Sequence, residues 1–327
     1  MTPTTPSQYP IELLPPDITA HKPGNTGIEY VWSFASERDG PHVMIAAVTH
    51  GNELCGAIVV DEFLRQGLRP QRGRLTLAFI NVAAFHAFDH KNPTASRFVD
   101  EDFNRLWKSE VLDGPRDSVE LRRARELRPV LDSVDYLLDI HSMQHKTPPL
   151  MMAGPLPKGR ALAAEIGIPE LVVSDSGHVA GRRMRDYARF SDPVSEKNAL
   201  LVECGQHWEA AAAPRARETA RRFLANFGTV PAGNEDTAAN ETPPPPQRFI
   251  EVTTAVTIQS HDFTFANDYR GGEVIEKAGT LLGHDGEEPV VTPYDNCILI
   301  MPSRRLKVGQ TAVRLGRFVP APKAASA

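Results

Sequence analysis

Short, mostly apolar runs separated by stretches of helical spacing constrain the fold of this chain more than any other feature. Val43 to Val48, Tyr136 to Ile140 and Ala199 to Val202 are such runs, each bounded by polar or turn-forming residues. Runs of this length without regular polar alternation are typical of strands buried on both faces of a sheet. From Glu53 to Gln66, and again from Val119 to Leu131, apolar residues recur at helical spacing instead. Strands that alternate with helices predict an α/β fold.

The composition changes abruptly in the last third of the chain. Residues 231–247 are polar and rich in proline, ending in four consecutive prolines and a glutamine, which is typical of a linker. The short β-like runs that follow are punctuated by glycines. We therefore predict a catalytic domain over residues 1–230, a linker over 231–247 and a small β-rich domain over 248–327.

Charge and cysteine content exclude several functional classes. The net charge of −5 provides no basic field that would attract nucleic acid or anionic lipid. No apolar run approaches the ~18 residues that a membrane span needs, and the first residues lack the features of a signal peptide. The three cysteines are far apart and form no paired motif, so that neither a disulfide framework nor a cysteine zinc site is expected. These features predict a cytoplasmic protein and leave open whether it is a homo-oligomer.

Chemically active residues follow three of the apolar runs. His50 and Glu53 come after the first run, His141 after the second and Glu203 after the third. Ligands bind at the carboxyl ends of the strands in an open α/β sheet. Two histidines and one carboxylate are a common zinc set that leaves the fourth position to water. We therefore predict one Zn²⁺ per chain at His50, Glu53 and His141, with Gly51 easing the turn.

The predicted metal site suggests roles for its neighbours. Zinc lowers the pKa of a bound water towards ~7, which gives a nucleophile at neutral pH. Glu203 would accept the proton of this water and pass it to the leaving amine. Asp139 could orient a ligating imidazole. His145 and His207 are close enough in sequence to line the site.

Each of these residues, taken singly, has an ordinary structural explanation. An isolated His-x-x-Glu pattern is a weak signal. His141 alone is more often a hydrogen-bonded core histidine, and Glu203 alone could be a salt-bridged residue at a strand end. Their coincidence after three predicted strands favours the metal site.

Four motifs, spaced along the chain, resemble those of a known protein family. His50-Gly-Asn-Glu53, Arg97-Phe-Val-Asp-Glu-Asp-Phe-Asn-Arg105, Asp139-Ile-His141 and Val202-Glu203 occur in this order. In this respect the chain resembles the succinylglutamate desuccinylase/aspartoacylase family, which is related to the M14 zinc carboxypeptidases. The resemblance covers roughly residues 43–205 and continues more faintly into the C-terminal region.

The resemblance implies a mixed sheet between helices, one zinc ion, and hydrolysis of a small N-acyl amino acid. It assigns Glu203 as general base and places Arg97, Asn104 and Arg105 at substrate-contact positions. A guanidinium suits a carboxylate, and a second one can stabilise an oxyanion. We expect Arg97 to bind the substrate carboxylate and Arg105 to lie nearer the reacting carbonyl. The alternative is that the 97–105 segment is a surface ion-pair cluster.

The substrate is less closely constrained than the chemistry. Tyr187 and Arg189 occupy a region where aspartoacylases bind substrate, but with different spacing, so they are weak candidates. Tyr294 could reach the substrate if the C-terminal domain covers the crevice, or it could merely lie in a turn. We predict a zinc amidohydrolase; the alternatives are a metallocarboxypeptidase acting on peptides and a binding module without activity. The last is disfavoured because every expected catalytic residue is present.

Overall fold

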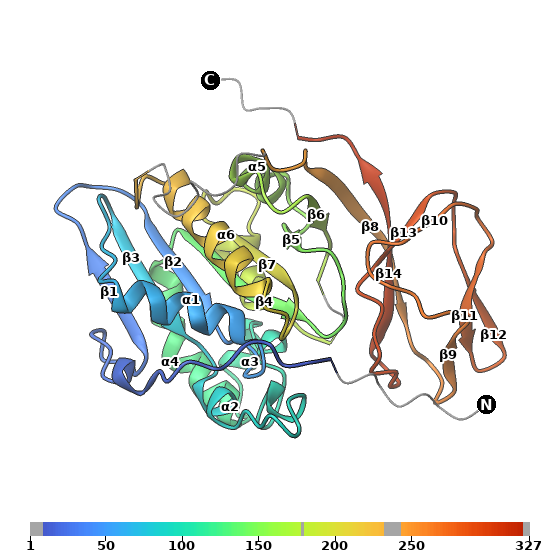
Figure 1. Ribbon diagram of the computed structural model, residues 1–327, viewed down its shortest axis with the longest axis horizontal. Coiled ribbons are helices and arrows are strands. Elements are labelled where there is room, and N and C mark those ends of the chain that lie inside the picture. The colour runs from blue at the N-terminus through green and yellow to red at the C-terminus, as the bar shows by residue number, and fades with distance from the viewer. Residues whose placement is uncertain (1–8, 178–179, 232–242, 323–327) are drawn as a thin grey trace.

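A single mixed sheet organises the computed structural model, which describes residues 9–177, 180–231 and 243–322 (Figure 1). Within these residues eleven strands share the sheet in the order β1-β3-β2-β4-β7-β5-β6-β8-β14-β13-β10. Parallel and antiparallel neighbours both occur, so the predicted mixed α/β fold is confirmed. A second sheet of three strands, β12-β11-β9, lies beyond the edge of the large sheet that the C-terminal strands form.

The predicted apolar strands form the parallel centre of the large sheet. They are β2 (His42–Ala47), β4 (Tyr136–Met143) and β7 (Asn198–Gln206), and β3 (Arg74–Phe79) pairs in parallel with β2 beside them. The register pairs Ala47 with both Phe79 and Ile140, and Ile140 with Val202, so the strands end near one edge. β4 and β7 run past the predicted strand ends and include His141 and Glu203 themselves.

Helices cover both faces of this centre, which explains why its strands lack polar alternation. α1 (Leu54–Arg65), α5 (Pro157–Ile166) and α6 (Ala212–Asn226) pack into one buried cluster. α4 (Val119–Ser133) packs into another cluster with the opposite side chains of β2 and β4. The helices expected from Glu53 and from Val119 are therefore present, each within two residues of its predicted end.

The segment between residues 144 and 198 holds elements that the sequence patterns did not indicate. β5 (Leu150–Met152) and β6 (Leu171–Ser174) are too short to give a period, and α5 lies between them. β5 runs antiparallel to β7 and parallel to β6. The sheet therefore changes direction between β7 and β5, and β5, β6 and β8 all run opposite to β7.

The C-terminal strands continue the large sheet. β8 (Arg248–Thr257) pairs in parallel with β6, and β14 (Thr311–Val319) pairs antiparallel with β8. β13 (Cys297–Ile300) follows on β14. Most of the predicted linker, residues 232–242, lies outside the described residues, and the division into three domains stays a prediction.

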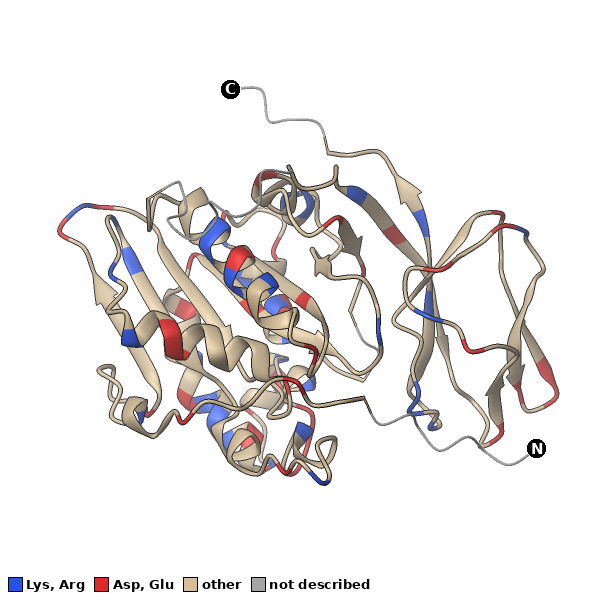
Figure 2. Ribbon diagram, viewed as in Figure 1, with Lys and Arg blue, Asp and Glu red and all other residues tan. Residues whose placement is uncertain are grey.

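Short elements complete the described chain. They are β1 (Val31–Ala35), β9 (Phe263–Phe265), β10 (Val274–Ile275), β11 (Leu281–Asp285), β12 (Glu288–Val291), α2 (Val82–His86), α3 (Ser109–Leu112) and 3₁₀ helices at Thr19–His21, Ala95–Arg97, Phe103–Arg105, Met184–Asp186 and Ala188–Ser191. Charged side chains of both signs are interspersed along the molecule (Figure 2). None of the described helices combines the length and apolarity needed to cross a bilayer.

Candidate active site

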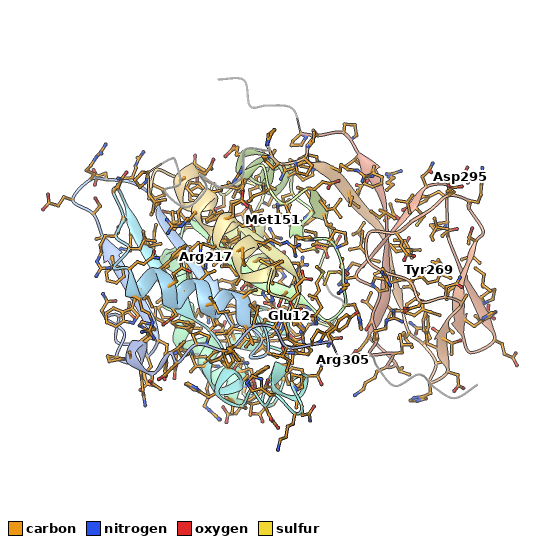
Figure 3. The ribbon with its side chains drawn as sticks, in the orientation of Figure 1. Glu12, Met151, Arg217, Tyr269, Asp295 and Arg305 are labelled. Atoms are coloured by element: carbon orange, nitrogen blue, oxygen red, sulfur yellow. The ribbon has the colours of Figure 1, made fainter. Side chains whose placement is uncertain are left out.

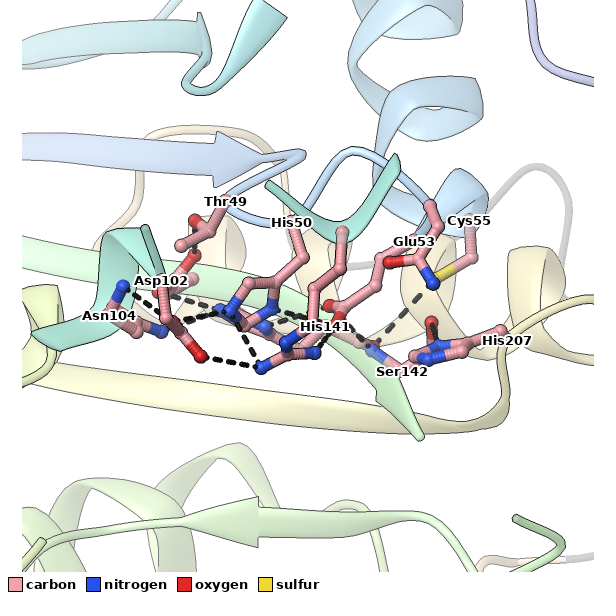
Figure 4. Close-up of polar contacts among 12 residues, drawn as sticks. Thr49, His50, Glu53, Cys55, Asp102, Asn104, His141, Ser142 and His207 are labelled. Carbon is pink, nitrogen blue, oxygen red and sulfur yellow. Dashed lines mark hydrogen bonds and ion pairs between the residues drawn. The ribbon is translucent and has the colours of Figure 1, made fainter. Parts of the chain in front are cut away.

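The three predicted metal ligands form one buried cluster. His50 lies after β2, Glu53 lies immediately before α1, and His141 is part of β4. His50 Nδ1 lies 2.7 Å from Glu53 Oε1, and His141 Nδ1 lies 2.8 Å from Glu53 Oε2 (Figure 4). Each of the three residues is at most 4% exposed, and their ligand atoms lie within 4.8 Å of one another. The cluster could therefore hold a metal ion.

Gly51 allows the loop that carries His50 and Glu53 to approach α2. A Cβ atom at this position would lie 2.2 Å from the carbonyl carbon of Ala84. The contact is with backbone, so it could not be relieved by moving a side chain. The glycine is thus required by a close approach of two backbone segments, rather than by the turn alone.

A carboxylate faces the second nitrogen of each imidazole. His141 Nε2 lies 2.8 Å from Asp139 Oδ2, and Thr49 donates to the other oxygen of Asp139. His50 Nε2 lies 3.0 Å from Asp102 Oδ1. Carboxylates in these positions hold an imidazole with Nδ1 directed at a metal. Asp139 occupies the position expected from the sequence, whereas Asp102 was not singled out.

Opposing charges set the ionisation of this cluster. Burial would raise the pKa of Glu53, but the adjacent His50 and His141 lower it well below its usual range. Burial likewise opposes ionisation of Asp102, and Arg97 and His50 hold its pKa well below the usual range. Both carboxylates are therefore charged at neutral pH and can face cations.

Glu203 lies on β7 beside His141 on β4 and lines the same cavity. It is 7% exposed, and its Oε2 has no hydrogen-bond partner among the described residues. Burial and the negative charge of Glu53 raise the pKa of Glu203 well above its usual range. A divalent cation in the cluster would counter this effect, because it favours the charged carboxylate.

The two arginines of the 97–105 segment differ in their distance from the candidate metal ligands. Arg97, and not Arg105, touches the ligand cluster: its Nη1 donates to Glu53 Oε1 at 3.4 Å and its Nη2 to Asp102 Oδ2 at 3.1 Å. Arg105 is farther out; its Nη1 donates to the backbone oxygen of Asn104, and burial lowers its pKa to about 10. Arg97 therefore lies closer than Arg105 to the candidate metal ligands, and which of the two arginines faces the reacting carbonyl stays a prediction.

Asn104 is fixed from two sides. Its Nδ2 lies 3.3 Å from His141 Nε2, and its Oδ1 accepts from the backbone nitrogen of Met184. It lines the cavity together with Arg97 and Arg105, so the structure brings all three predicted contact residues together. These three residues lie close to the buried candidate metal ligands. This proximity disfavours the alternative that the 97–105 segment is only a surface ion-pair cluster.

The cavity extends well beyond the cluster, with a volume of about 480 Å³. Its far wall comes from the segment around β13 and β14, including Met301, Ser303 and Thr311. Among the described lining residues, six are cationic and three are acidic. The cations are Arg97, Arg105, Arg183, Arg305, Lys307 and Arg314, and the acids are Glu53, Asp102 and Glu203.

Arg183 belongs to a buried ion network that the sequence patterns did not indicate. Its guanidinium donates to both oxygens of Asp175 at 2.7 and 3.1 Å, and to Asp186 at 2.6 Å. Arg314, on β14, lies 3.5 Å from the same Asp175. The network therefore links β14 to the segment that contains Asp175, Arg183 and Asp186. Arginines outside any motif gave no signal in the sequence, since their contacts are made only in the folded chain.

The remaining candidates divide into two groups. His145 and His207 both line the cavity, as their positions suggested. Tyr294 does not: its hydroxyl lies 2.6 Å from that of Thr253, and it is absent from the described cavity lining. Tyr187 hydrogen-bonds to Asp132 and also lies outside the cavity. Arg189 likewise lies outside it.

The mixed sheet and its buried His–Glu–His cluster define an α/β protein with a candidate metal site at the edge of the sheet. The sequence profile of the "Succinylglutamate desuccinylase/Aspartoacylase catalytic domain" matches residues 39–227, more than half of the chain. The chain belongs to the succinylglutamate desuccinylase/aspartoacylase family, whose named members hydrolyse amide bonds.

Individual relatives are distant. Succinylglutamate desuccinylase of Vibrio vulnificus (strain YJ016) is 22% identical over 83% of this chain and 79% of its own length. An N-acyl-aromatic-L-amino acid amidohydrolase (carboxylate-forming) of Danio rerio is 34% identical, over 31% of this chain and 32% of its own. The crystal structure of the Vibrio parahaemolyticus desuccinylase is similar in fold, with a TM-score of 0.69 and 18% identity over 89% of this chain and 87% of that one.

Proposed function

We propose that this protein is a zinc-dependent amidohydrolase that removes the acyl group from a small N-acyl amino acid. The observation that carries the proposal is that the buried His50–Glu53–His141 cluster shares its cavity with Glu203, one of whose carboxylate oxygens has no hydrogen-bond partner among the described residues. A cavity of about 480 Å³ is of the size that binds small molecules. Membership of a family of amide hydrolases supports the same reading.

The donor set suits zinc. Two imidazoles and one carboxylate are a common catalytic zinc set, and both imidazoles are backed by carboxylates. His50, Glu53 and His141 would hold the ion. When bound, zinc would lower the pKa of a coordinated water and polarise the substrate carbonyl.

Glu203 is suited to move the proton. Glu203 lines the cavity and is 7% exposed, and its Oε2 has no hydrogen-bond partner among the described residues. It would accept a proton from the attacking water and return it to the nitrogen of the departing amine. The carbonyl carbon then keeps the water oxygen, and the C–N bond breaks to give a carboxylic acid and an amine.

The two arginines should show separable kinetic defects. Because Arg97 touches the ligand cluster, it can stabilise the oxyanion, and Arg97→Gln is expected to lower kcat by roughly 10²- to 10³-fold. Arg105 is farther out and suits the substrate carboxylate, so that Arg105→Gln should raise KM by roughly 10- to 100-fold with a smaller change in kcat. Steady-state kinetics of both variants, with zinc content verified, would check this division. Identical defects would contradict it.

The walled cavity favours a deacylase over a carboxypeptidase. A peptide substrate needs an open crevice for its chain, whereas here the segment that leads into β14 lines the far side of the cavity. The intact, zinc-loaded protein is expected to hydrolyse N-acyl amino acids at least about 10²-fold faster than a tripeptide, measured as kcat/KM. Comparable efficiency on the tripeptide would favour the carboxypeptidase.

The direct test of the proposed function is a metal analysis combined with an assay panel. Protein purified without added metal is expected to contain one zinc per chain and to release free amine from at least one N-acyl amino acid. Absence of hydrolysis in zinc-loaded protein across a broad panel of acyl groups and amino acids would overturn the proposal.

A further inference from the structure

A buried glutamate at the start of α4 is neither a candidate metal ligand, nor the base, nor a substrate contact. Glu120 is the second residue of this helix, and its exposed fraction is 0%. It is absent from the described cavity lining and from the ligand cluster. A buried carboxylate is costly unless its oxygens are hydrogen-bonded. The groups that bind it therefore indicate what it does.

Among the described residues, four N–H groups donate to the carboxylate of Glu120, and three of them come from consecutive backbone positions. Its Oε1 accepts from the backbone nitrogen of Val99 at 2.6 Å and from Asn81 Nδ2 at 3.1 Å. Its Oε2 accepts from the backbone nitrogens of Asp100 at 3.0 Å and Glu101 at 3.2 Å. Successive backbone N–H groups that converge in this way form a concave site for an anion. The carboxylate therefore fixes the turn that these three residues form.

The first residues of α4 bind the same turn through two further contacts. Ser118, the N-cap of the helix, donates from Oγ to Glu101 Oε1 at 2.6 Å. The backbone nitrogen of Val119 donates to Asp100 Oδ2 at 2.7 Å. In contrast, the side chain of Val99 is 47% exposed and adds little apolar packing. Hydrogen bonds to the start of α4, rather than a hydrophobic contact, thus hold the turn.

The residues on either side of this turn face the candidate metal ligands. Before it, the backbone oxygen of Arg97 accepts from the nitrogen of Gly51 at 3.1 Å, and its side chain donates to Glu53. After it, Asp102 accepts from Arg97 Nη2 at 3.1 Å and lies 3.0 Å from His50 Nε2 (Figure 4). A displaced turn would therefore move both the arginine and the aspartate relative to the cluster.

We infer that Glu120 is a positioning residue, whose carboxylate fixes the turn at residues 99–101 and so holds Arg97 and Asp102 against the candidate metal ligands. Its effect on catalysis rests on the proposed function. Glu120 acts through these two residues, since it does not itself line the cavity. Glutamine has nearly the same size, but its amide group has only one acceptor oxygen. Glu120→Gln would therefore bring a donor against at least one of the N–H groups that the carboxylate now binds.

Glu120→Gln is expected to lower kcat by about 10- to 100-fold, because a small misplacement of reacting groups by a distant change can cost about 10²-fold. The measurement is kcat on an N-acyl amino acid per folded, zinc-loaded protein. At least one backbone amide in residues 98–104 should also exchange its hydrogen at least about tenfold faster than in the wild type. Wild-type kcat, or wild-type exchange throughout these residues, would overturn the inference.

Glu62→Gln is the control matched in chemistry. Glu62 also belongs to a helix, α1, and accepts from Arg217 Nε and Nη2 at 2.6 to 2.9 Å. It is absent from the described cavity lining, and Figure 3 shows Arg217 on α6, away from Arg305 of the cavity wall. This variant should keep wild-type kcat and wild-type exchange of residues 98–104. The same losses as in Glu120→Gln would overturn the inference.

Leu127→Ala is the control matched in stability. Leu127 is a fully buried residue of α4, so its truncation destabilises the protein without removing a contact to the turn. Per folded protein, its kcat should equal that of the wild type. A loss as large as in Glu120→Gln would show that the glutamate acts only through stability, which would overturn the inference.

A double-mutant cycle tests the route by which Glu120 acts. In protein that already carries Arg97→Gln, Glu120→Gln should lower kcat by less than about threefold, because the side chain that it positions is absent. An undiminished loss would overturn the inference. Should Glu120→Gln not fold, Glu120→Asp decides, since it keeps the charge but is one methylene shorter. It should lower kcat at least about threefold, and wild-type kcat in it would overturn the inference.

Hydrogen exchange distinguishes failure of the positioning role from failure of the proposed function, because it requires neither substrate nor metal. If the wild-type protein hydrolyses no N-acyl amino acid, the proposed function fails, and exchange of residues 98–104 then decides on Glu120. Faster exchange in Glu120→Gln but not in Glu62→Gln would support the positioning role. Equal exchange in the two variants would overturn it.

Discussion

Glu203→Gln is expected to lower kcat by roughly 10²- to 10⁴-fold while the protein keeps its zinc. Glutamine has nearly the same size and still forms hydrogen bonds, but it cannot accept a proton. Glu203 lies beside the cluster and not among the three ligands, so its replacement should leave metal binding in place. The measurement is kcat on an N-acyl amino acid, with zinc content determined on the same sample.

A matched control separates this effect from any general loss of carboxylates near β7. Glu209, six residues further along, forms an ion pair with Arg215 and is absent from the described cavity lining. Glu209→Gln should therefore keep nearly full activity. Near wild-type activity in Glu203→Gln would show that another group takes the proton, and loss of zinc from that variant would mean that Glu203 is a ligand.

His141→Ala is expected to abolish zinc binding and, with it, activity. Partners behind a ligand typically contribute 10- to 100-fold to metal affinity, so removal of the ligand itself should weaken binding by at least about 10²-fold. The variant also leaves Glu53 and Asp139 without the imidazole that lies between them. Zinc content by elemental analysis after dialysis gives the result without any assay of activity.

His145→Ala serves as the control for this measurement. His145 lines the same cavity, but it contacts Tyr9 and does not belong to the cluster. Its replacement should leave the zinc content unchanged. Full zinc occupancy in His141→Ala would remove the central assumption of the proposed function, whatever the activity.

The sequence was informative where local pattern decides the outcome. Val43 to Val48 and Tyr136 to Ile140 are mostly apolar because helices cover both faces of the sheet, and the structure places β2 and β4 there. β5 and β6 have three and four residues, too few to show a period, and the reversed direction of β5 depends on a neighbour some fifty residues away in sequence. Sheet order beyond β7 was therefore not predictable.

The candidate site was likewise only partly predictable from the sequence. His50, Glu53 and His141 could be singled out because each follows an apolar run. Asp102 could not, since its place behind His50 depends on how the polar 97–105 segment folds back over the cluster. Arg305 is even less accessible to sequence reasoning, because its surroundings are formed by residues more than 150 positions earlier in the chain.

Because the sheet continues from β6 into β8, the candidate catalytic residues and the far wall of the cavity come from different parts of the chain. The candidate metal ligands and base come from the first 203 residues, whereas the far wall of the cavity comes from residues beyond 256. Substitutions in residues 301–311 can therefore reshape the wall while β2, β4 and β7 keep the ligands in register. Substitutions in the wall can therefore change which substrates are accepted, while the candidate metal ligands and the base keep their positions.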